Sequence, residues 1–179
     1  VITGAVTSAQ NIIKSVNRAG LDVVDIILQP LASSEAVLSA EERELGVAMV
    51  DLGGGTTDLA IFLDGSIRHT AVLPIGGQNL TKDLAIGLLT SPTDAEKIKV
   101  QHGIARTELV HGHQMVEVPS VGDRPPRQFT RRDIAEILEP RVEEMFDLVK
   151  REIVRAGYEG MLGAGVVITY PFMFNSVGY

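Results

Sequence analysis

Hydrophobic and polar positions follow two different periods along the first part of the chain. Apolar residues three and four positions apart predict a helix over residues 11–19, ended by Gly20, and the apolar run that follows predicts a strand over residues 21–28. A proline at position 30 then opens a short packed helix that ends before Gly46. The first quarter of the chain is therefore expected to mix helix and strand.

Residues 47–73 have the pattern of an antiparallel meander. The run at 47–52 is almost entirely apolar, as expected of a strand that is buried on both faces. Two β-rich runs follow on either side of Asp64-Gly65, a dipeptide typical of a tight hairpin turn. We therefore expect the glycine-rich turn at 53–57 to join the first two strands, and the Asp-Gly turn to join the second and third.

The next part of the pattern predicts two helices, a second hairpin and a linker. One helix is expected over residues 81–89, and another begins soon after it with Ser91 or Thr93 as its cap. Alternating residues at 107–121 predict a smaller hairpin, and the proline pair at 125–126 marks a linker.

A long amphipathic helix is predicted to follow. Apolar residues keep a spacing of three and four from Ile134 to Val154, Thr130 is placed to cap the first turn, and Pro140 is the one irregularity. Residues 163–169 then predict another buried strand. Helices and apolar strands in this order, without an internal repeat, indicate an α/β fold.

The amino-acid composition limits the classes of protein to which the chain can belong. The chain has 179 residues, and its 45% hydrophobic content is enough for a real core. A run of about 18 uncharged apolar residues is absent, and residues 1–10 lack signal-peptide features, so we expect the chain by itself to be soluble. The sequence contains no cysteine, which excludes disulfides and thiolate metal sites and suits a reducing cytosol.

The net charge of −7 argues against a nucleic-acid partner, because phosphate binding needs clustered Lys and Arg. One basic cluster is present, and we interpret it as a solvated turn rather than an anion site. It comprises Arg124, Arg127, Arg131 and Arg132. The HxH pair at 111–113 lacks a third ligand nearby, which favours a surface loop over a metal site.

The stretch VDLGGGTTDLAIF, residues 50–62, carries the clearest chemical signal. It matches neither a P-loop nor a dinucleotide fingerprint, because both of those open a helix and this turn leads into a strand. The backbone N–H groups of its glycines and first threonine can approach a phosphate closely, and the threonine hydroxyls add donors. These residues are Gly53, Gly54, Gly55, Thr56 and Thr57.

Asp51, at the end of the first strand, is placed to hold a hydrated Mg²⁺. The alternative for three consecutive glycines is a β-bulge or a hairpin turn without a ligand.

Together with its flanking aspartates, the turn has the DxGGGTTD signature and resembles the actin-like ATPase superfamily, which includes actins, heat-shock chaperones and sugar kinases. The resemblance implies that Gly76 and Gly77 form a second turn facing the nucleotide. In the stretch AEKIK it implies that Glu96 and Lys99 face the ribose and base. A surface ion pair is the alternative for that i, i+3 pair.

Longer segments are similar to the FtsA family of bacterial cell-division proteins, over about residues 1–169. In chain order they read NIIKSVNRAGLDV, PLASSEAVLSAEERELGVAMVDLGGGTTDLAIF, IRHTAVLPIGGQNLTKDLAIGLL, DAEKIKVQHGIA and VEVPSVGDRPPR. This resemblance implies an actin-like protein at the cytoplasmic face of the membrane at the division site. Such a protein binds ATP with Mg²⁺, links FtsZ filaments to the membrane, assembles into actin-like filaments and recruits other division proteins.

The family plan also implies a division of the chain. Residues 1–45 would contain the last strand of the inserted subdomain, at residues 1–5, and the remainder of the first lobe. Residues 46–80 begin the second lobe, 81–128 form a small FtsZ-associated subdomain, and 129–179 return to the second lobe.

Three departures from the family plan lead us to expect a fragment. The first phosphate loop of the N-terminal lobe has no counterpart here, and neither has the C-terminal amphipathic helix that lies on the membrane. After Thr169 the family continues with a Gly-Gly turn, whereas this chain continues with an aromatic tail. A truncated or frameshifted reading is favoured over an aromatic stacking platform.

Competing functions of the same fold are a sugar kinase or other phosphotransferase and a chaperone ATPase. A kinase needs a base that activates an acceptor, for which Asp58 or Glu35 could be nominated; a solvent-facing helix residue is an equal interpretation of Glu35. The chaperone is disfavoured because no separate β-rich peptide-binding domain follows. We therefore expect an ATP-binding adaptor with at most weak ATPase activity.

Overall fold

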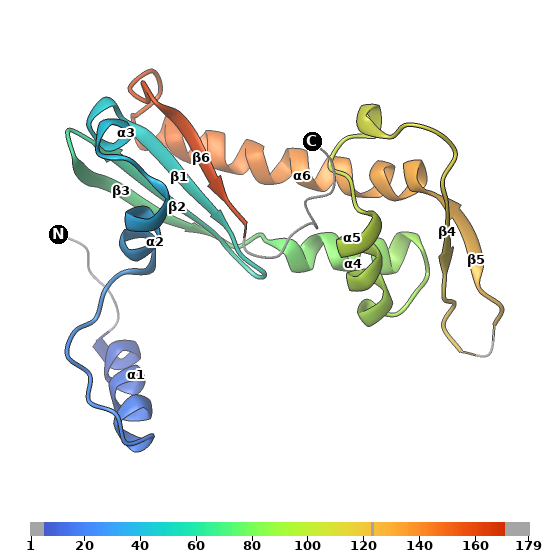
Figure 1. The fold of residues 1–179 in the computed structure, drawn as a ribbon, viewed down its shortest axis with the longest axis horizontal. Helices are drawn as coiled ribbons and strands as arrows, with labels where there is room; N and C mark the ends of the chain where they lie inside the picture. The colour runs from blue at the N-terminus through green and yellow to red at the C-terminus, as the bar shows by residue number, and fades with distance from the viewer. Residues whose placement is uncertain (1–5, 123, 171–179) are drawn as a thin grey trace. The chain divides into compact units, whose positions relative to one another are not determined.

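The computed structural model describes residues 6–122 and 124–170 of the chain (Figure 1). They fall into two compact units, which divide between Val37 and Leu38 and are described separately. The strand expected at residues 1–5 and the tail after Tyr170 lie outside the described residues.

The first unit contains two helices, α1 (Val6–Arg18) and α2 (Gln29–Val37). Helix α1 begins five residues earlier than the apolar spacing predicted. The strand predicted over residues 21–28 is wrong, because this segment has no regular secondary structure. A strand needs a neighbour for its N–H and C=O groups, and no other strand is present in the described part of this unit.

The second unit is built on a four-stranded sheet with the order β3-β2-β1-β6. Its strands are β1 (Val47–Leu52), β2 (Thr57–Leu63), β3 (Ser66–Leu73) and β6 (Gly165–Thr169). The first three form the predicted antiparallel meander, and β6 pairs with β1 in parallel. Asp64 and Gly65 both have positive φ, 50° and 69°, as a tight turn between twisted strands requires.

Burial follows the position of each strand in the sheet. Every residue of central β1 is buried, as its continuous apolar run predicted. Strand β6 lies at the sheet edge, and its Val166 and Ile168 side chains are 49% and 41% exposed. The prediction that β6 is a buried strand is therefore wrong in its burial, because an apolar run does not distinguish a central strand from an edge strand.

Between α2 and β1 the structure has a further helix, α3 (Ala40–Leu45), where one continuous helix was expected. Ser39 has extended backbone angles and caps α3: its hydroxyl accepts from the Glu42 N–H, and its own N–H donates to the Glu42 carboxylate at 2.7 Å. This reciprocal capping box begins a new helix at Ala40.

Helices α4 (Gly77–Gly87) and α5 (Pro92–His102) follow the meander, and Ser91 caps α5 as predicted. The hairpin predicted within residues 107–121 is wrong. A 3-10 turn, η1 (Thr107–Leu109), occupies the start of that range, and β4 (Met115–Val118) pairs with β5 (Arg127–Thr130). The proline pair at 125–126 thus lies in the loop of a hairpin rather than in a linker.

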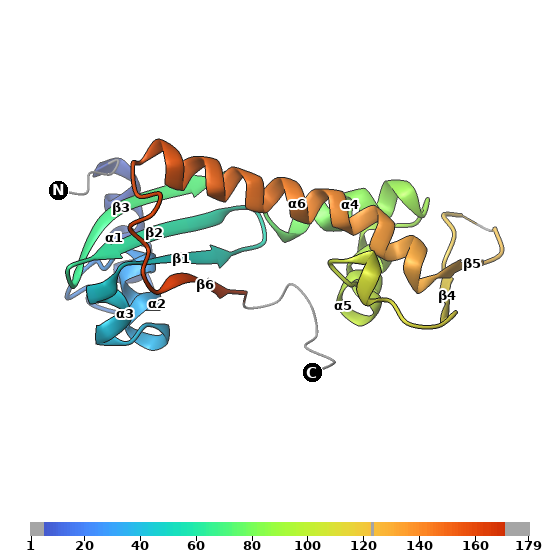
Figure 2. The same ribbon diagram turned by 90° about the horizontal axis from the view of Figure 1, so that it is seen from above.

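Helix α6 (Arg131–Arg155) is the predicted long helix. Thr130 and Asp133 form its capping box, and the helix continues through Pro140. It runs along the sheet and past α4 and α5 to the β4–β5 hairpin (Figure 2). The core beneath it joins the sheet to α4, α5 and α6, and it includes Val50, Leu59, Ile61, Leu80, Leu84, Ile134, Leu138 and Met145. Among the described residues, no helix is both long and apolar enough to span a bilayer.

Candidate functional site

The structure brings the two predicted glycine turns together. The first joins β1 to β2, and the second lies between β3 and α4. The Gly77 N–H donates to the Gly53 carbonyl at 2.9 Å, and the Gln78 N–H donates to the Gly54 carbonyl at 2.8 Å. Two segments more than 20 residues apart therefore form one backbone-bonded unit at the ends of the strands.

Gly76 is required by this contact. A Cβ atom at position 76 would lie 2.6 Å from both the Gly53 and the Gly54 carbonyl oxygens, closer than side-chain carbons approach backbone atoms. The absence of a side chain at Gly76 is thus explained by the close approach of the two turns. Asn79 completes the second turn by accepting a hydrogen bond from the Gly76 N–H at 3.0 Å.

The first turn keeps part of its donor row open. The Gly53 N–H donates to the Thr56 carbonyl at 2.9 Å, which closes the turn. Within the described chain, the N–H groups of Gly54, Gly55 and Thr56 have no hydrogen-bond partner, and all three residues are exposed. Two of these three donors belong to glycines, which have no Cβ atom, so an anion can approach their N–H groups closely.

The two threonines of the turn have different environments. Thr56 is exposed, whereas the Thr57 side chain is fully buried and its hydroxyl donates to the Ile75 carbonyl at 2.8 Å. Thr57 therefore fastens the first turn to the segment that leads into the second. Both residues are threonine in the sequence, so residue type alone could not separate these two roles.

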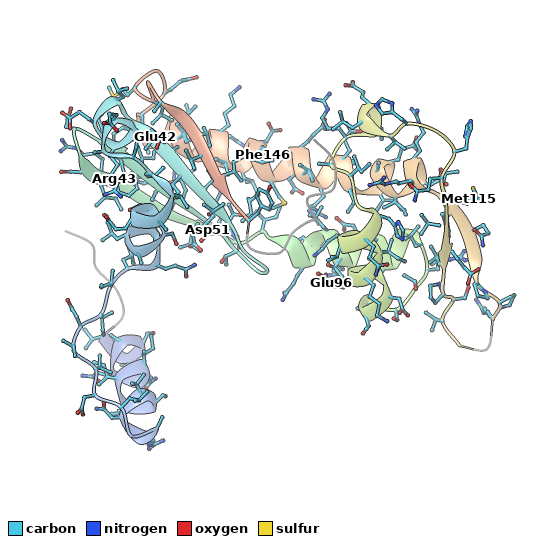
Figure 3. All side chains as sticks on the ribbon, in the orientation of Figure 1. Glu42, Arg43, Asp51, Glu96, Met115 and Phe146 are labelled. Carbon is cyan, nitrogen blue, oxygen red and sulfur yellow. The ribbon has the colours of Figure 1, made fainter. Side chains whose placement is uncertain are left out.

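Asp51 and Asp58 lie directly opposite each other in the β1–β2 register at the base of the first turn (Asp51 is labelled in Figure 3). Asp51 is 8% exposed. Burial raises the pKa of Asp58, and the charge of Asp51 raises it further. Two facing carboxylates repel each other, so a cation beside them would be attracted to both. In the described ranges, no cluster of three or more metal-ligating side chains is present.

Lys99 and Glu96, both on α5, lie behind the second turn (Glu96 is labelled in Figure 3). Lys99 is 3% exposed, and its ammonium group donates to the Gly77 carbonyl, the Thr81 hydroxyl and the Glu96 carboxylate at 3.1, 3.0 and 2.8 Å. The interpretation of this pair as a surface ion pair is therefore wrong for Lys99.

The Glu96 side chain is 47% exposed, in contrast to Lys99. Burial tends to raise the pKa of Glu96, but hydrogen bonds from Lys99 and Thr81 outweigh it and lower the pKa. Glu96 is therefore a fixed, ionised acceptor at neutral pH, with part of its carboxylate accessible.

Two residues of α4 join the site that the sequence reasoning did not name. The Gln78 side-chain amide lies about 4 Å from where Cβ atoms would stand on Gly54 and Gly55. Thr81, 8% exposed, donates its hydroxyl to Glu96 and accepts from Lys99. A threonine on the buried side of a helix, four residues after a glycine pair, is the signal that could have indicated Thr81.

Glu35 lies exposed on α2 of the first unit, so a role for it remains a prediction. His111 and His113 are exposed in the loop between η1 and β4.

Comparisons with solved structures define the class of fold. MreB 5 of Spiroplasma citri, solved with AMPPNP bound, superposes with a TM-score of 0.70 at 20% identity over 94% of this chain and 54% of that one. The ethanolamine utilization protein EutJ of Carboxydothermus hydrogenoformans gives 0.62 at 22% identity over 95% and 58%. The chain thus has part of an actin-like fold, as the sequence predicted.

Sequence comparisons identify the family. The family model described as Cell division protein FtsA matches residues 48–175. Curated FtsA proteins of Pseudomonas aeruginosa, Escherichia coli K12 and Bacillus subtilis are 52%, 48% and 42% identical over 94%, 90% and 94% of this chain. This chain belongs to the FtsA family of cell division proteins. It spans about 40% of the length of these relatives, and the match does not favour a phosphotransferase.

Proposed function

We propose that this chain contributes one side of the ATP site of an FtsA-type division adaptor. The observation that carries the proposal is the pair of bonded glycine turns, which leaves the N–H groups of Gly54, Gly55 and Thr56 open. These donors would bind the β- and γ-phosphates of ATP, with Gly53 and Thr57 shaping the turn. The related MreB 5 of Spiroplasma citri was solved with ADP and with AMPPNP, which is consistent with this assignment.

The carboxylates of Asp51 and Asp58 fit a hydrated Mg²⁺, because hard oxygen donors with a net negative charge suit this ion. Bound there, Mg²⁺ would neutralise phosphate charge. Glu96 would accept hydrogen bonds from the ribose hydroxyls, and Gly76 and Gly77 would line the same side of the site. At most weak hydrolysis of ATP is proposed.

As a member of its family, the whole protein is proposed to bind FtsZ, to form actin-like filaments, and to bring other division proteins to the cytoplasmic face of the membrane. Within this chain, a pocket of about 590 Å³ lies between the end of α4 and the β4–β5 loop. Its walls combine apolar residues with two arginines, which suits an acidic, apolar peptide, and we propose this pocket as the FtsZ contact. The lining residues include Leu89, Val121, Arg124, Pro125 and Arg127.

The test is calorimetric titration of Mg-ATP into the full-length protein that contains this chain. Asp51→Asn should weaken binding at least tenfold, because one of two carboxylates near the cation loses its charge. Asp64→Asn is the matched control, since Asp64 is an exposed carboxylate at the opposite end of β2, and it should bind as the unchanged protein does. Absence of Mg-ATP binding by the unchanged protein would refute the proposal.

A further inference from the structure

Lys99 occupies an unusual position for a lysine. Its side chain is 3% exposed, and each of its three ammonium hydrogens has an acceptor: the Gly77 carbonyl, the Thr81 hydroxyl and the Glu96 carboxylate. An ammonium group has three donors and no acceptor. Contact between this group and a ligand would therefore require the loss of a bond that the buried charge needs.

The acceptors of Lys99 connect it to both sides of the proposed nucleotide site. The Gly77 carbonyl accepts a hydrogen bond from Lys99, and the N–H of the same peptide group, which belongs to Gln78, donates to the Gly54 carbonyl in the first turn. On the other side, Lys99 and Thr81 both donate to Glu96. A continuous set of hydrogen bonds thus links Glu96 to the phosphate-binding turn through one buried ammonium group.

We propose that Lys99 is a positioning residue, which holds Glu96 and the second glycine turn in their binding geometry and does not itself contact the nucleotide. This inference rests on the proposed function and deepens it. The Lys99 ammonium group holds both the Glu96 carboxylate, which would accept from the ribose, and the Gly77 backbone beside the phosphate-binding turn. Recognition of the ribose and recognition of the phosphates therefore depend on each other.

Loss of Lys99 should therefore weaken the binding of two ligands, one with a nucleoside and one without. A lysine that contacted the ribose directly would affect only the ligand with a nucleoside. Mg-tripolyphosphate presents the phosphates without a nucleoside, whereas Mg-ATP presents both. In the full-length protein, Lys99→Met keeps the apolar stem, and we expect it to weaken Mg-ATP and Mg-tripolyphosphate at least tenfold each, as loss of charged hydrogen bonds commonly does. Lys97→Met is the control, since Lys97 is 64% exposed on the same helix, and should leave both affinities unchanged.

A double-mutant cycle then tests whether Lys99 acts through Glu96. Glu96→Gln alone should weaken the binding of Mg-ATP by a larger factor than the binding of Mg-tripolyphosphate, because only ATP presents ribose hydroxyls to Glu96. With Glu96→Gln already present, Lys99→Met should weaken Mg-ATP by a clearly smaller factor than in the unchanged protein, because part of its effect has been removed. If the two factors simply multiply for Mg-ATP, and Lys99→Met leaves Mg-tripolyphosphate unchanged, Lys99 contacts the nucleoside directly and the inference is wrong.

Thr81 supplies a second test that does not alter the buried charge. Thr81→Val removes the hydroxyl between Lys99 and Glu96 at a position 8% exposed, and it should weaken Mg-ATP several-fold. Thr81→Ser restores the hydroxyl and should restore the affinity. Equal affinities for Thr81→Val and the unchanged protein would overturn the inference even if Lys99→Met did not fold. Failure of the unchanged protein to bind Mg-ATP would instead refute the proposed function.

Discussion

His69 Nε2 on β3 lies 2.9 Å from Glu152 Oε1 on α6, and this contact fastens the long helix to the sheet. Glu152 is only 7% exposed, and it also pairs with Arg155 one turn later. The hydrogen bond from Arg155 lowers the pKa of Glu152, burial opposes this, and the contact with His69 lowers the pKa further.

Stability should therefore depend on pH through Glu152. Because its folded pKa lies below the ordinary value of 4.5, the ionised carboxylate stabilises the fold above that pH, and the contribution is lost as pH falls through the folded pKa. Glu152→Gln should lower the free energy of unfolding by about 1–2 kcal/mol at pH 7, and by progressively less as the pH falls through the folded pKa of Glu152. Urea denaturation across this range measures both. A difference that stays constant with pH, or an equal effect of the exposed Glu159→Gln, would contradict the prediction.

Gly76→Ala should separate the two glycine turns. The added methyl group would overlap two carbonyl oxygens at 2.6 Å, whereas Gly54→Ala meets only the end of the Gln78 side chain at 3.9 Å. We expect Gly76→Ala to destabilise the protein by about 1–3 kcal/mol, as overpacking commonly does, and Gly54→Ala to remain close to the unchanged protein. Thermal unfolding compares the two. Similar melting temperatures for both variants would show that the turns can move apart freely.

Thr57→Val tests the buried hydroxyl that fastens the first turn. This change keeps the shape but leaves the Ile75 carbonyl without its donor at a fully buried position, which should cost about 1–3 kcal/mol of stability. Thr57→Ser keeps the donor and should lose less. Chemical denaturation gives the order of the three proteins, and a Ser variant less stable than the Val variant would count against the role of the hydroxyl.

Val121→Asp should weaken the proposed FtsZ contact. Val121 lines the pocket at the β4–β5 loop and is 62% exposed, so a carboxylate there is expected to repel an acidic peptide without disturbing the core. Co-sedimentation of the full-length variant with FtsZ filaments should fall several-fold. Val72→Asp, on β3 and 65% exposed, is the matched control. Equal co-sedimentation of both variants would place the FtsZ contact elsewhere.

Local sequence patterns predicted those elements whose interacting residues are close to one another in the sequence. The β1–β3 meander and the caps at Ser91 and Thr130 were found, because turn chemistry and capping depend on a few adjacent residues. The prediction of a strand at residues 21–28 failed because a strand forms only where a second strand pairs with it, and an apolar run does not show whether such a strand is present. The second hairpin was misplaced because alternation cannot identify the pairing of β4 with a strand nine residues further on.

The candidate site likewise has a part that the sequence predicted and a part that it did not. The glycine turns and Asp51 could be named from their motif, and the structure brings the two turns into contact. The burial of Lys99 could not be predicted, since a lysine at i, i+3 from a glutamate is by default a surface residue. Its location depends on helix α5 packing against α4, a tertiary relationship that neither segment encodes alone.

Helix α6 has a mechanical consequence. It is unbroken for 25 residues, about 38 Å at 1.5 Å per residue, and it is fastened to the sheet by Glu152 and to α4 by the Arg141–Asp83 pair. The β4–β5 hairpin leads directly into the first turn of α6, and the last turns of the same helix are bonded to β3. A displacement of the hairpin would therefore be passed through one rigid element to the sheet that carries the first glycine turn.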